Sequence, residues 1–382
     1  MPKYRLLTPG PTEVPEAARL AMARALRHHR TAEFRELLAE VEQGLKHVFQ
    51  TSNDVVILAS SGTGAMEAAV ANVVPRGGKA IVLESGKFAE RWTRLCERFG
   101  IHAVRYVVPW GEAFLPRRVG ELLDEHPDAV AVYATLQETS TGVGHDIEGI
   151  GRVVGPRAAL LVVDGISGVG AMECRTDAWG IDLLVVGAQK ALMTPPGLAF
   201  LAVSPAAWRQ IESFEPPAFY FDLSAYRKAS ADCQTPYTPA IPLIHALAES
   251  LRQLRSEPIE AIWARGRMLS QATRAGLTAL GFRLVAQRPA DGVTAAWAPD
   301  GLDAKALLER LERRFGVKLA GGQGPLAGKA IRIAHLGQID ALDILAALAA
   351  IELVLVEMGR PVKLGAGVAA AAEAIARFGA TA

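Results

Sequence analysis

Short apolar runs alternate with amphipathic stretches along the first half of the chain. The near-continuous apolar runs predict strands at 55–59, 80–84, 102–108, 129–134, 160–163, 183–186 and 198–203. Stretches with helical periodicity lie between most of these runs, and two further amphipathic helices are predicted before them, at 16–25 and 33–49. Strands that alternate with helices predict a mostly parallel sheet of seven strands sandwiched by helices. Continuous apolar runs are typical of strands buried on both faces, so the pattern indicates an α/β fold.

The pattern changes after a turn-rich connection at 215–242. Helices are then predicted at 239–255, 258–280, 303–315, 340–358 and, in an Ala-rich tail, 368–378. Short strands are predicted at 282–286, 293–297 and 330–334. This alternation predicts a second, smaller α/β domain. We therefore divide the chain into an N-terminal arm (1–15), a large domain (16–257) and a small C-terminal domain (258–382).

Composition narrows the functional classes. The 382 residues are enough for two domains, and half of them are hydrophobic. The 41 basic and 40 acidic side chains nearly balance, which gives no basic footprint for nucleic acid or for an anionic membrane. Cys96, Cys174 and Cys233 form no CxxC pair, so we expect reduced thiols rather than disulfides or zinc ligands. Without a secretory h-region or a long apolar run, we expect a cytoplasmic protein that does not span a membrane.

Candidate catalytic and ligand-binding residues follow the ends of three predicted strands. The turn Ser61–Gly64 follows the strand at 55–59, Asp164 ends the run at 160–163, and Lys190 follows the run at 183–186. In parallel sheets ligands bind beyond the carboxyl ends of the strands. We therefore expect these residues to meet in one site.

The turn Ser61–Gly64 opens a predicted helix at 65–74. Backbone N–H groups at that helix start, with the Ser61 or Thr63 hydroxyl, would form an anion cradle. Glu67 stands where a dinucleotide fingerprint needs its third glycine, and the Gly-Lys-Ser/Thr of a P-loop is missing. An ordinary strand–helix turn is the alternative.

Asp164 and Lys190 each allow several interpretations. Asp164 could cap a turn, bind a metal or face a cationic ring nitrogen, but His145, Asp146 and Glu148 lack metal-ligand spacing. Lys190 could be an exposed loop residue or could form a Schiff base with an aldehyde cofactor. A phosphate cradle, a ring-nitrogen acid and a Schiff-base lysine together predict pyridoxal 5′-phosphate (PLP), with no metal.

The chain resembles the fold-type I, class V PLP-dependent aminotransferases, in particular the alanine/serine–glyoxylate (or pyruvate) aminotransferase group. The resemblance extends over nearly the whole chain. It is carried by the segments LLTPGPTEVP, SSGTGAMEAA, ESGKFAERW, QETSTGV, LLVVDGISGVGAM, DLLVVGAQKALMTPPGLAF, TPYTPAIPLIHALAESL and AIRIAHLG.

The resemblance implies a role for each residue around the cofactor ring. It implies that Lys190 holds PLP as a Schiff base and that Asp164 faces the ring nitrogen. Ile166 would pack on one ring face and Phe88 would stack on the other, where many relatives have tryptophan. Thr139 would contact the ring oxygen or support the cofactor from behind.

The resemblance also implies how the phosphate is held. Ser61, Gly62 and Thr63 match the phosphate-binding turn, and Gln189 matches the phosphate contact beside the lysine. Tyr237 and Thr238 match residues that reach the phosphate of the neighbouring subunit, which implies a homodimer with composite active sites. Some relatives carry threonine in place of Ala240, so the contact across the subunits is open at that position.

The substrate side of the site is implied in the same way. Arg332 matches the arginine that binds the substrate carboxylate, and the segment 8–11 matches the part that closes over the substrate. Each of three residues also has a simpler interpretation. Phe88 could pack in the core, Tyr237 could be an ordinary loop residue, and Arg332 could lie on the surface. No role is predicted for His28, His29 and His335, and packing roles are predicted for Trp92 and Trp110.

The implied activity is a ping-pong transamination. It would move an amino group from a small amino acid, alanine or serine, to a 2-oxo acid, glyoxylate or pyruvate. A cysteine-desulfurase-like lyase is one alternative, but Gln189 stands where that group has histidine, and no cysteine follows Cys233. A non-catalytic subunit that retains the fold is the other, although Lys190, Asp164 and Arg332 are all present.

Overall fold

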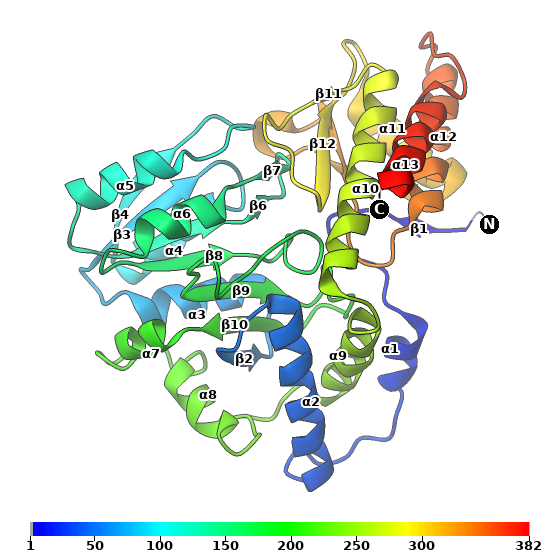
Figure 1. Ribbon diagram of the computed structural model, residues 1–382. Helices are drawn as coiled ribbons and strands as arrows, with labels where there is room; N and C mark the ends of the chain where they lie inside the picture. Colours follow the sequence, from blue (N-terminus) through cyan, green and yellow to red (C-terminus); the bar gives the residue numbers. More distant parts are fainter. Residues whose placement is uncertain (1–2, 382) are drawn as a thin grey trace.

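A seven-stranded mixed sheet organises the first two-thirds of the chain in the computed structural model, which describes residues 3–381 (Figure 1). Its strand order is β2 (Asp54–Leu58), β10 (Ala199–Val203), β9 (Leu183–Gly187), β8 (Leu160–Asp164), β5 (Ala129–Thr135), β3 (Lys79–Glu84) and β4 (His102–Val107). Strand β10 runs antiparallel to both of its neighbours, and the other pairs are parallel. The predicted α/β class with a mostly parallel seven-stranded sheet is confirmed.

Alternate residues of each strand enter two separate hydrophobic cores, because side chains in a strand point to opposite faces. Val163 packs on one face and Val162 on the other. The first face carries α2 (Ala32–Phe49), α5 (Pro116–Glu125), α6 (Ile147–Val154) and α9 (Ile241–Leu254). The second carries α3 (Gly62–Val73), α4 (Glu90–Phe99), α7 (Pro205–Ile211) and α8 (Leu223–Ser230).

Helix α1 (Glu16–Ala21) packs against α9 and is shorter than predicted. The prediction extended it to residue 25. The following residues find no apolar surface to cover, and Leu26 is exposed. The helix therefore ends at Ala21, the last residue of its buried face, which also includes Ala18.

A smaller antiparallel sheet follows, in the order β11 (Arg283–Leu284), β12 (Val293–Trp297), β15 (Ala330–Ala334) and β14 (Ala320–Gly321). It shares a core with α10 (Ile259–Ala279), α11 (Ala304–Phe315), α12 (Ala341–Glu357) and α13 (Ala366–Thr381), which lie together in Figure 1. Strand β11 is shorter than the predicted strand at 282–286. The Val285 N–H still donates to the Ala295 carbonyl of β12 at 3.0 Å, and two residues later the Gln287 N–H donates to the Gly111 carbonyl, in the loop after β4, at 2.8 Å.

The N-terminal arm and one hairpin connect the two sheets. In the arm, β1 (Arg5–Leu6) pairs with β13 (Val317–Lys318), and the Thr12 hydroxyl donates to the Lys190 carbonyl at 2.8 Å. The hairpin consists of β6 (Gln137–Glu138) and β7 (Val143–Gly144). The Oε1 of Gln137 in this hairpin accepts the Gly292 N–H at 2.9 Å. A short 3-10 helix, η1 (Gly324–Leu326), precedes β15. Within residues 3–381, no helix is both long enough and apolar enough to cross a membrane.

Candidate active site

The residues predicted at the strand ends surround one cavity of about 170 Å³. Strands β8 and β9 are parallel neighbours, so Asp164 at the end of β8 lies beside the segment that carries Lys190. Nine of the twelve predicted site residues line the cavity: Ser61, Gly62, Thr63, Phe88, Thr139, Asp164, Ile166, Gln189 and Lys190. Ser61, Asp164 and Lys190, which the strand-end rule placed together, therefore do line one cavity.

Asp164 is a buried carboxylate, 4% exposed, with little compensation from the protein. Its Oδ1 accepts the Ile166 N–H at 2.9 Å. Within residues 3–381, Oδ2 accepts no hydrogen bond. Burial raises the pKa of Asp164 to about 6, the Ile166 N–H opposes that shift, and the nearby Glu138 carboxylate adds to it. A cationic N–H group in the cavity would stabilise this carboxylate.

Lys190 lines the same cavity and is partly buried. Burial lowers the pKa of its amine to about 8, and the Asp164 carboxylate opposes this shift. Its Nζ donates to the Pro9 carbonyl, so the N-terminal arm lies directly over it. A Cβ on Gly10 would come within 2.5–2.7 Å of the Lys190 side chain, and Gly10 has a φ of +103°. Only glycine therefore fits this close approach of the arm.

The start of α3 provides donors on another wall of the cavity. Ser61 is the extended N-cap residue, and its side chain makes no capping hydrogen bond. Among the described residues, the N–H groups of Gly62 and Thr63 have no acceptor, which is the arrangement that binds anions at helix N-termini. The Gln189 Oε1 is buried without a hydrogen bond. These unsatisfied groups fit a phosphate-bearing cofactor that would occupy the cavity.

Hydrophobic and hydroxyl side chains complete the cavity. Ile166 contacts Gly62 so closely that a Cβ on Gly62 would lie 2.5 Å from the Ile166 Cδ1. Phe88 lies on the turn before α4, with the Arg91 guanidinium 5.4 Å from its ring centre. The Thr139 hydroxyl donates to the Ser167 hydroxyl at 2.7 Å. The cavity therefore combines apolar surface with directed polar groups, as sites for aromatic cofactors do.

A second cavity, of about 400 Å³, adjoins the first and shares Phe88, Thr139 and Lys190 with it. Arg332, on β15 of the small sheet, lines this second cavity and is only 7% exposed. Its Nε donates to the Gly321 carbonyl at 2.9 Å and its Nη1 to the Thr139 carbonyl at 3.0 Å. Burial lowers the pKa of Arg332 to about 10. Within the described chain Nη2 has no acceptor, so one edge of the guanidinium is free for an anion.

Tyr237 and Thr238 lie outside both cavities. They line a small separate hollow, where the Tyr237 ring stacks on Tyr220 at 5.0 Å and its hydroxyl donates to the Phe219 carbonyl at 3.0 Å. Phe219 is 83% exposed. The chain does not bring Tyr237 and Thr238 to its own site, and the sequence prediction assigned them to the site of a neighbouring subunit.

The sequence prediction missed several residues that the structure brings to the site. Arg91, Gln137 and Ser167 line the first cavity, and Glu138 lies just behind it. Among the described residues, no group of three His, Cys, Asp or Glu side chains could hold a metal ion.

The fold and the groups around the cavity define a PLP-dependent enzyme of fold type I. The family model of the class-V aminotransferases matches residues 17–332. The chain therefore belongs to the class-V aminotransferases, which are PLP-dependent, and the resemblance seen in the sequence motifs is confirmed.

Three proteins illustrate what this chain is similar to over nearly its whole length. The chain is 42% identical over 378 residues to a soluble hydrogenase small subunit from Synechococcus sp. (strain PCC 6716), covering 98% of both chains. It is 36% identical over 376 residues to the L-aspartate–glyoxylate aminotransferase of Paracoccus denitrificans, covering 96% of this chain and 95% of that one. The pyridoxamine–pyruvate aminotransferase structure from Mesorhizobium loti has a TM-score of 0.93 and 29% identity, with 98% and 97% coverage.

Proposed function

We propose that this aminotransferase moves an amino group from a small amino acid to glyoxylate or pyruvate. The observation that carries the proposal is the pair of joined cavities. Lys190 borders both, Asp164 lines the first and Arg332 lines the second. Bound PLP supplies a carbonyl group for the substrate amine and a ring that accepts the electron pair released at the α-carbon.

Lys190 would first hold the cofactor and then move protons. The substrate amine would replace Lys190 on the cofactor. The freed Lys190 amine could then take a proton from the substrate α-carbon and return one to the adjacent cofactor carbon. A general base and acid works best when its pKa lies near the working pH. Burial lowers the pKa of Lys190 to about 8, which suits both directions of transfer.

Asp164 would keep the ring nitrogen protonated. Its Oδ2 oxygen, without a hydrogen bond from the described chain, is the acceptor for that N–H. A carboxylate whose pKa is raised by burial gains stability from a cationic partner, so each group favours the charged form of the other. Asp164 would thereby hold a proton at the ring nitrogen throughout the reaction.

The remaining residues would position the cofactor. The free N–H groups of Gly62 and Thr63, with Ser61 and Gln189, would bind the phosphate. Phe88 and Ile166 would pack on the ring, and Thr139 would contact its polar edge. The shape of the cavity and the unsatisfied polar groups in it support these assignments.

Arg332 would bind the substrate carboxylate in the second cavity. Two bonds to backbone carbonyls orient its guanidinium and leave one edge free for two parallel N–H···O bonds. The arm over Lys190 would cover the substrate from the other side. Glyoxylate and pyruvate both carry the carboxylate that this arrangement recognises.

The assembly we propose is a cytoplasmic homodimer with composite sites. Exposed Phe219 and the adjacent Tyr237 ring support an interface at this surface, from which Tyr237 and Thr238 would reach the partner's phosphate. We also propose the division into an arm (1–15), a large domain (16–257) and a small domain (258–382). This division is supported by the hydrophobic core of the small sheet, which is separate from the cores on the large sheet. Helix α10 contributes residues to the small-sheet core and to one of the large-sheet cores.

A donor–acceptor panel with the purified protein tests the activity. Alanine, serine and aspartate serve as donors, and glyoxylate and pyruvate as acceptors, with product amino acids measured by chromatography. We expect transfer from at least one small donor and loss of the cofactor's visible band when donor is added alone. Sulfide release from cysteine without amino transfer would identify a lyase, and absence of bound PLP would identify a non-catalytic subunit.

A further inference from the structure

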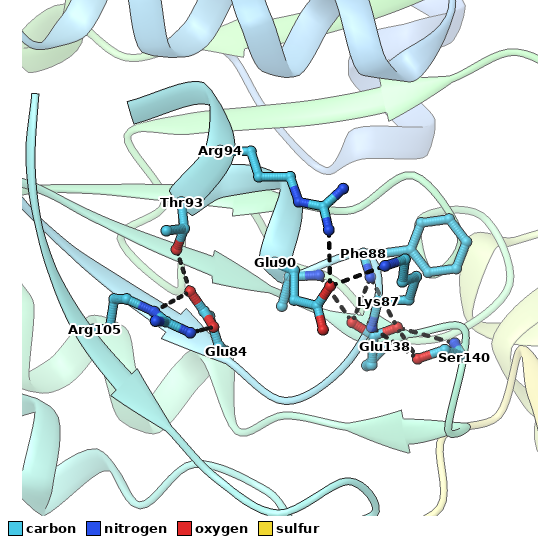
Figure 2. Close-up of polar contacts among 10 residues, drawn as sticks. Glu84, Lys87, Phe88, Glu90, Thr93, Arg94, Arg105, Glu138 and Ser140 are labelled. Atoms are coloured by element: carbon cyan, nitrogen blue, oxygen red, sulfur yellow. Dashed lines mark hydrogen bonds and ion pairs between the residues drawn. The ribbon is translucent and has the colours of Figure 1, made fainter. Parts of the chain in front are cut away.

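Glu138 is a completely buried carboxylate, 0% exposed, beside the cofactor cavity but outside its lining. Four donors converge on it. Its Oε2 accepts the N–H groups of Phe88 at 3.1 Å and Ala89 at 2.9 Å. Its Oε1 accepts the N–H of Ser140 at 2.9 Å and the Ser140 hydroxyl at 2.6 Å. Figure 2 shows these bonds converging on the Glu138 carboxylate.

The carboxylate fixes the two residues that precede α4. Ala89 is the N-cap residue of α4 and Phe88 comes directly before it, and Glu138 accepts the N–H groups of both from a distant part of the chain. Within residues 3–381, no Lys or Arg nitrogen forms an ion pair with it. Glu84, in contrast, is paired with Arg105 at 2.6 Å (Figure 2). The Glu138 carboxylate is therefore satisfied by backbone N–H groups and one hydroxyl rather than by a cationic side chain.

The turn before α4 is fixed on the Glu138–Ser140 segment by further contacts. The Lys87 N–H donates to the Ser140 hydroxyl at 3.1 Å. A Cβ on Gly86 would lie 2.5 Å from the Ser140 Oγ and 2.7 Å from the Glu138 Cδ, so only glycine allows this approach. Phe88, the residue proposed to stack on the cofactor ring, is the central residue of this turn.

The same segment also contacts the substrate side of the site. The Thr139 carbonyl, between Glu138 and Ser140, accepts the Arg332 Nη1–H at 3.0 Å. One three-residue segment therefore fixes the turn that carries Phe88 and orients the arginine proposed to bind the substrate carboxylate. Loosening its carboxylate anchor would disturb the Phe88 turn directly.

We propose that Glu138 is a positioning residue, which fixes the Phe88 turn so that the aromatic ring is preorganised against the PLP ring. This inference rests on the proposed cofactor role of Phe88. Glu138 touches neither the cofactor nor the substrate in this assignment and acts only through the backbone of the Phe88 turn.

The variant Glu138→Gln tests this role with minimal change in shape. An amide has one acceptor oxygen, and its NH₂ group would face either Ser140 or the Phe88 and Ala89 N–H groups. If the NH₂ group faces Ser140, the Ser140 N–H loses its acceptor while the hydroxyl can accept from the amide. If it faces the turn, the Phe88 and Ala89 N–H groups both lose their acceptor. Because the amide also removes the charge that strengthens the remaining bonds, we expect the PLP dissociation constant of the apoprotein to rise about 10- to 100-fold. The visible circular dichroism of bound PLP should change as well.

Glu352→Gln is the matched control. Glu352 is also a buried carboxylate that accepts three backbone N–H groups, from Gly365, Gly367 and Val368, but it lies on α12 in the small-sheet core. Its loss should lower thermal stability while PLP affinity and the circular dichroism of PLP stay at wild-type values.

A double-mutant cycle with Phe88→Ala separates positioning from general destabilisation. If Glu138 acts through Phe88, Glu138→Gln should weaken PLP binding less than threefold in the Phe88→Ala background. If Glu138→Gln does not fold, Ser140→Ala is a smaller change that removes one bond to the same carboxylate. In the wild-type background it should weaken PLP binding about 2- to 5-fold.

Unchanged PLP affinity in Glu138→Gln, an equal loss in Glu352→Gln, or full additivity with Phe88→Ala would overturn the inference. In the fallback case, unchanged affinity in Ser140→Ala would do the same. Wild-type protein that fails to bind PLP at all would overturn the proposed function itself, which distinguishes the two failures.

Discussion

Replacing Arg332 with alanine removes the proposed anchor of the substrate carboxylate. In the structure, Nε and one hydrogen of Nη1 are bonded to the Gly321 and Thr139 carbonyls, which leaves one edge of the guanidinium for two bonds to a ligand. Bonds to charged groups contribute about 1.5–3 kcal/mol each. Because the second cavity is open enough for water to replace part of this interaction, we expect a loss of about 2–4 kcal/mol in transition-state stabilisation, or roughly 30- to 700-fold in kcat/KM.

The assay compares two donors that differ only in the carboxylate. L-Alanine and ethylamine are mixed with PLP-loaded protein, and the decay of the cofactor band is followed in single-turnover half-reactions. Arg332→Ala should lose roughly 30- to 700-fold with alanine and less than about threefold with ethylamine. Arg332→Lys should behave like Arg332→Ala, because an ammonium cannot donate to both backbone carbonyls and still form two parallel bonds to the ligand.

PLP affinity serves as the control for structural damage in these variants. We expect it to stay within about threefold of wild type, since Arg332 lines the second cavity and not the first. Equal losses with alanine and with ethylamine would refute the assignment of Arg332 to the carboxylate. The class of substrate would then have to be inferred from other residues.

Three further predictions concern the cofactor and the assembly. Asp164→Asn keeps the shape of the side chain but loses its charge, so kcat should fall at least about 100-fold while PLP stays bound; activity near wild type would leave Asp164 as a turn cap. Because burial lowers the pKa of Lys190 to about 8 and the neutral amine is the nucleophile, the rate of PLP capture by the apoprotein should rise with pH around that value. Asp164→Asn should move this midpoint to lower pH, since the carboxylate favours the protonated amine; a midpoint near 10.5 in the wild type would contradict the burial argument. Mixing inactive Lys190→Ala chains with inactive Tyr237→Phe/Thr238→Ala chains should restore about a quarter of wild-type activity, because half of the dimers are then mixed and each has one intact site. No recovery despite demonstrated subunit exchange would place all these groups on one chain.

The hydrophobic pattern predicted the large sheet well because its strands are buried on both faces. The runs at 160–163 and 183–186 became β8 and β9 with one residue added at the end of each. Strand direction is not encoded in such runs, so the antiparallel course of β10 could not be read from the pattern. The two-residue pairing of β1 with β13 joins segments far apart in the sequence and leaves no periodic signal.

The site was predictable to the extent that strand ends define it. Asp164 and Lys190 follow from their positions after apolar runs, and parallel pairing of β8 with β9 brings those ends together. Arg332 comes from a different sheet, and only the resemblance to a family pointed to it. The role of Glu138 depends on a contact with the turn at 86–89, across 49 residues, which no local pattern contains. The role proposed for Tyr237 involves a second chain, so a pattern along one chain does not contain it.

The covalent attachment of PLP to Lys190 is the central claim, and borohydride trapping tests it most directly. Wild-type protein is incubated with PLP, reduced with borohydride, digested, and mapped by mass spectrometry. We expect one phosphopyridoxyl group per chain, on the peptide that contains Lys190, and no such label in Lys190→Ala. A stoichiometric label on any other lysine, or no label on a protein that is folded and exposed to excess PLP, would contradict it.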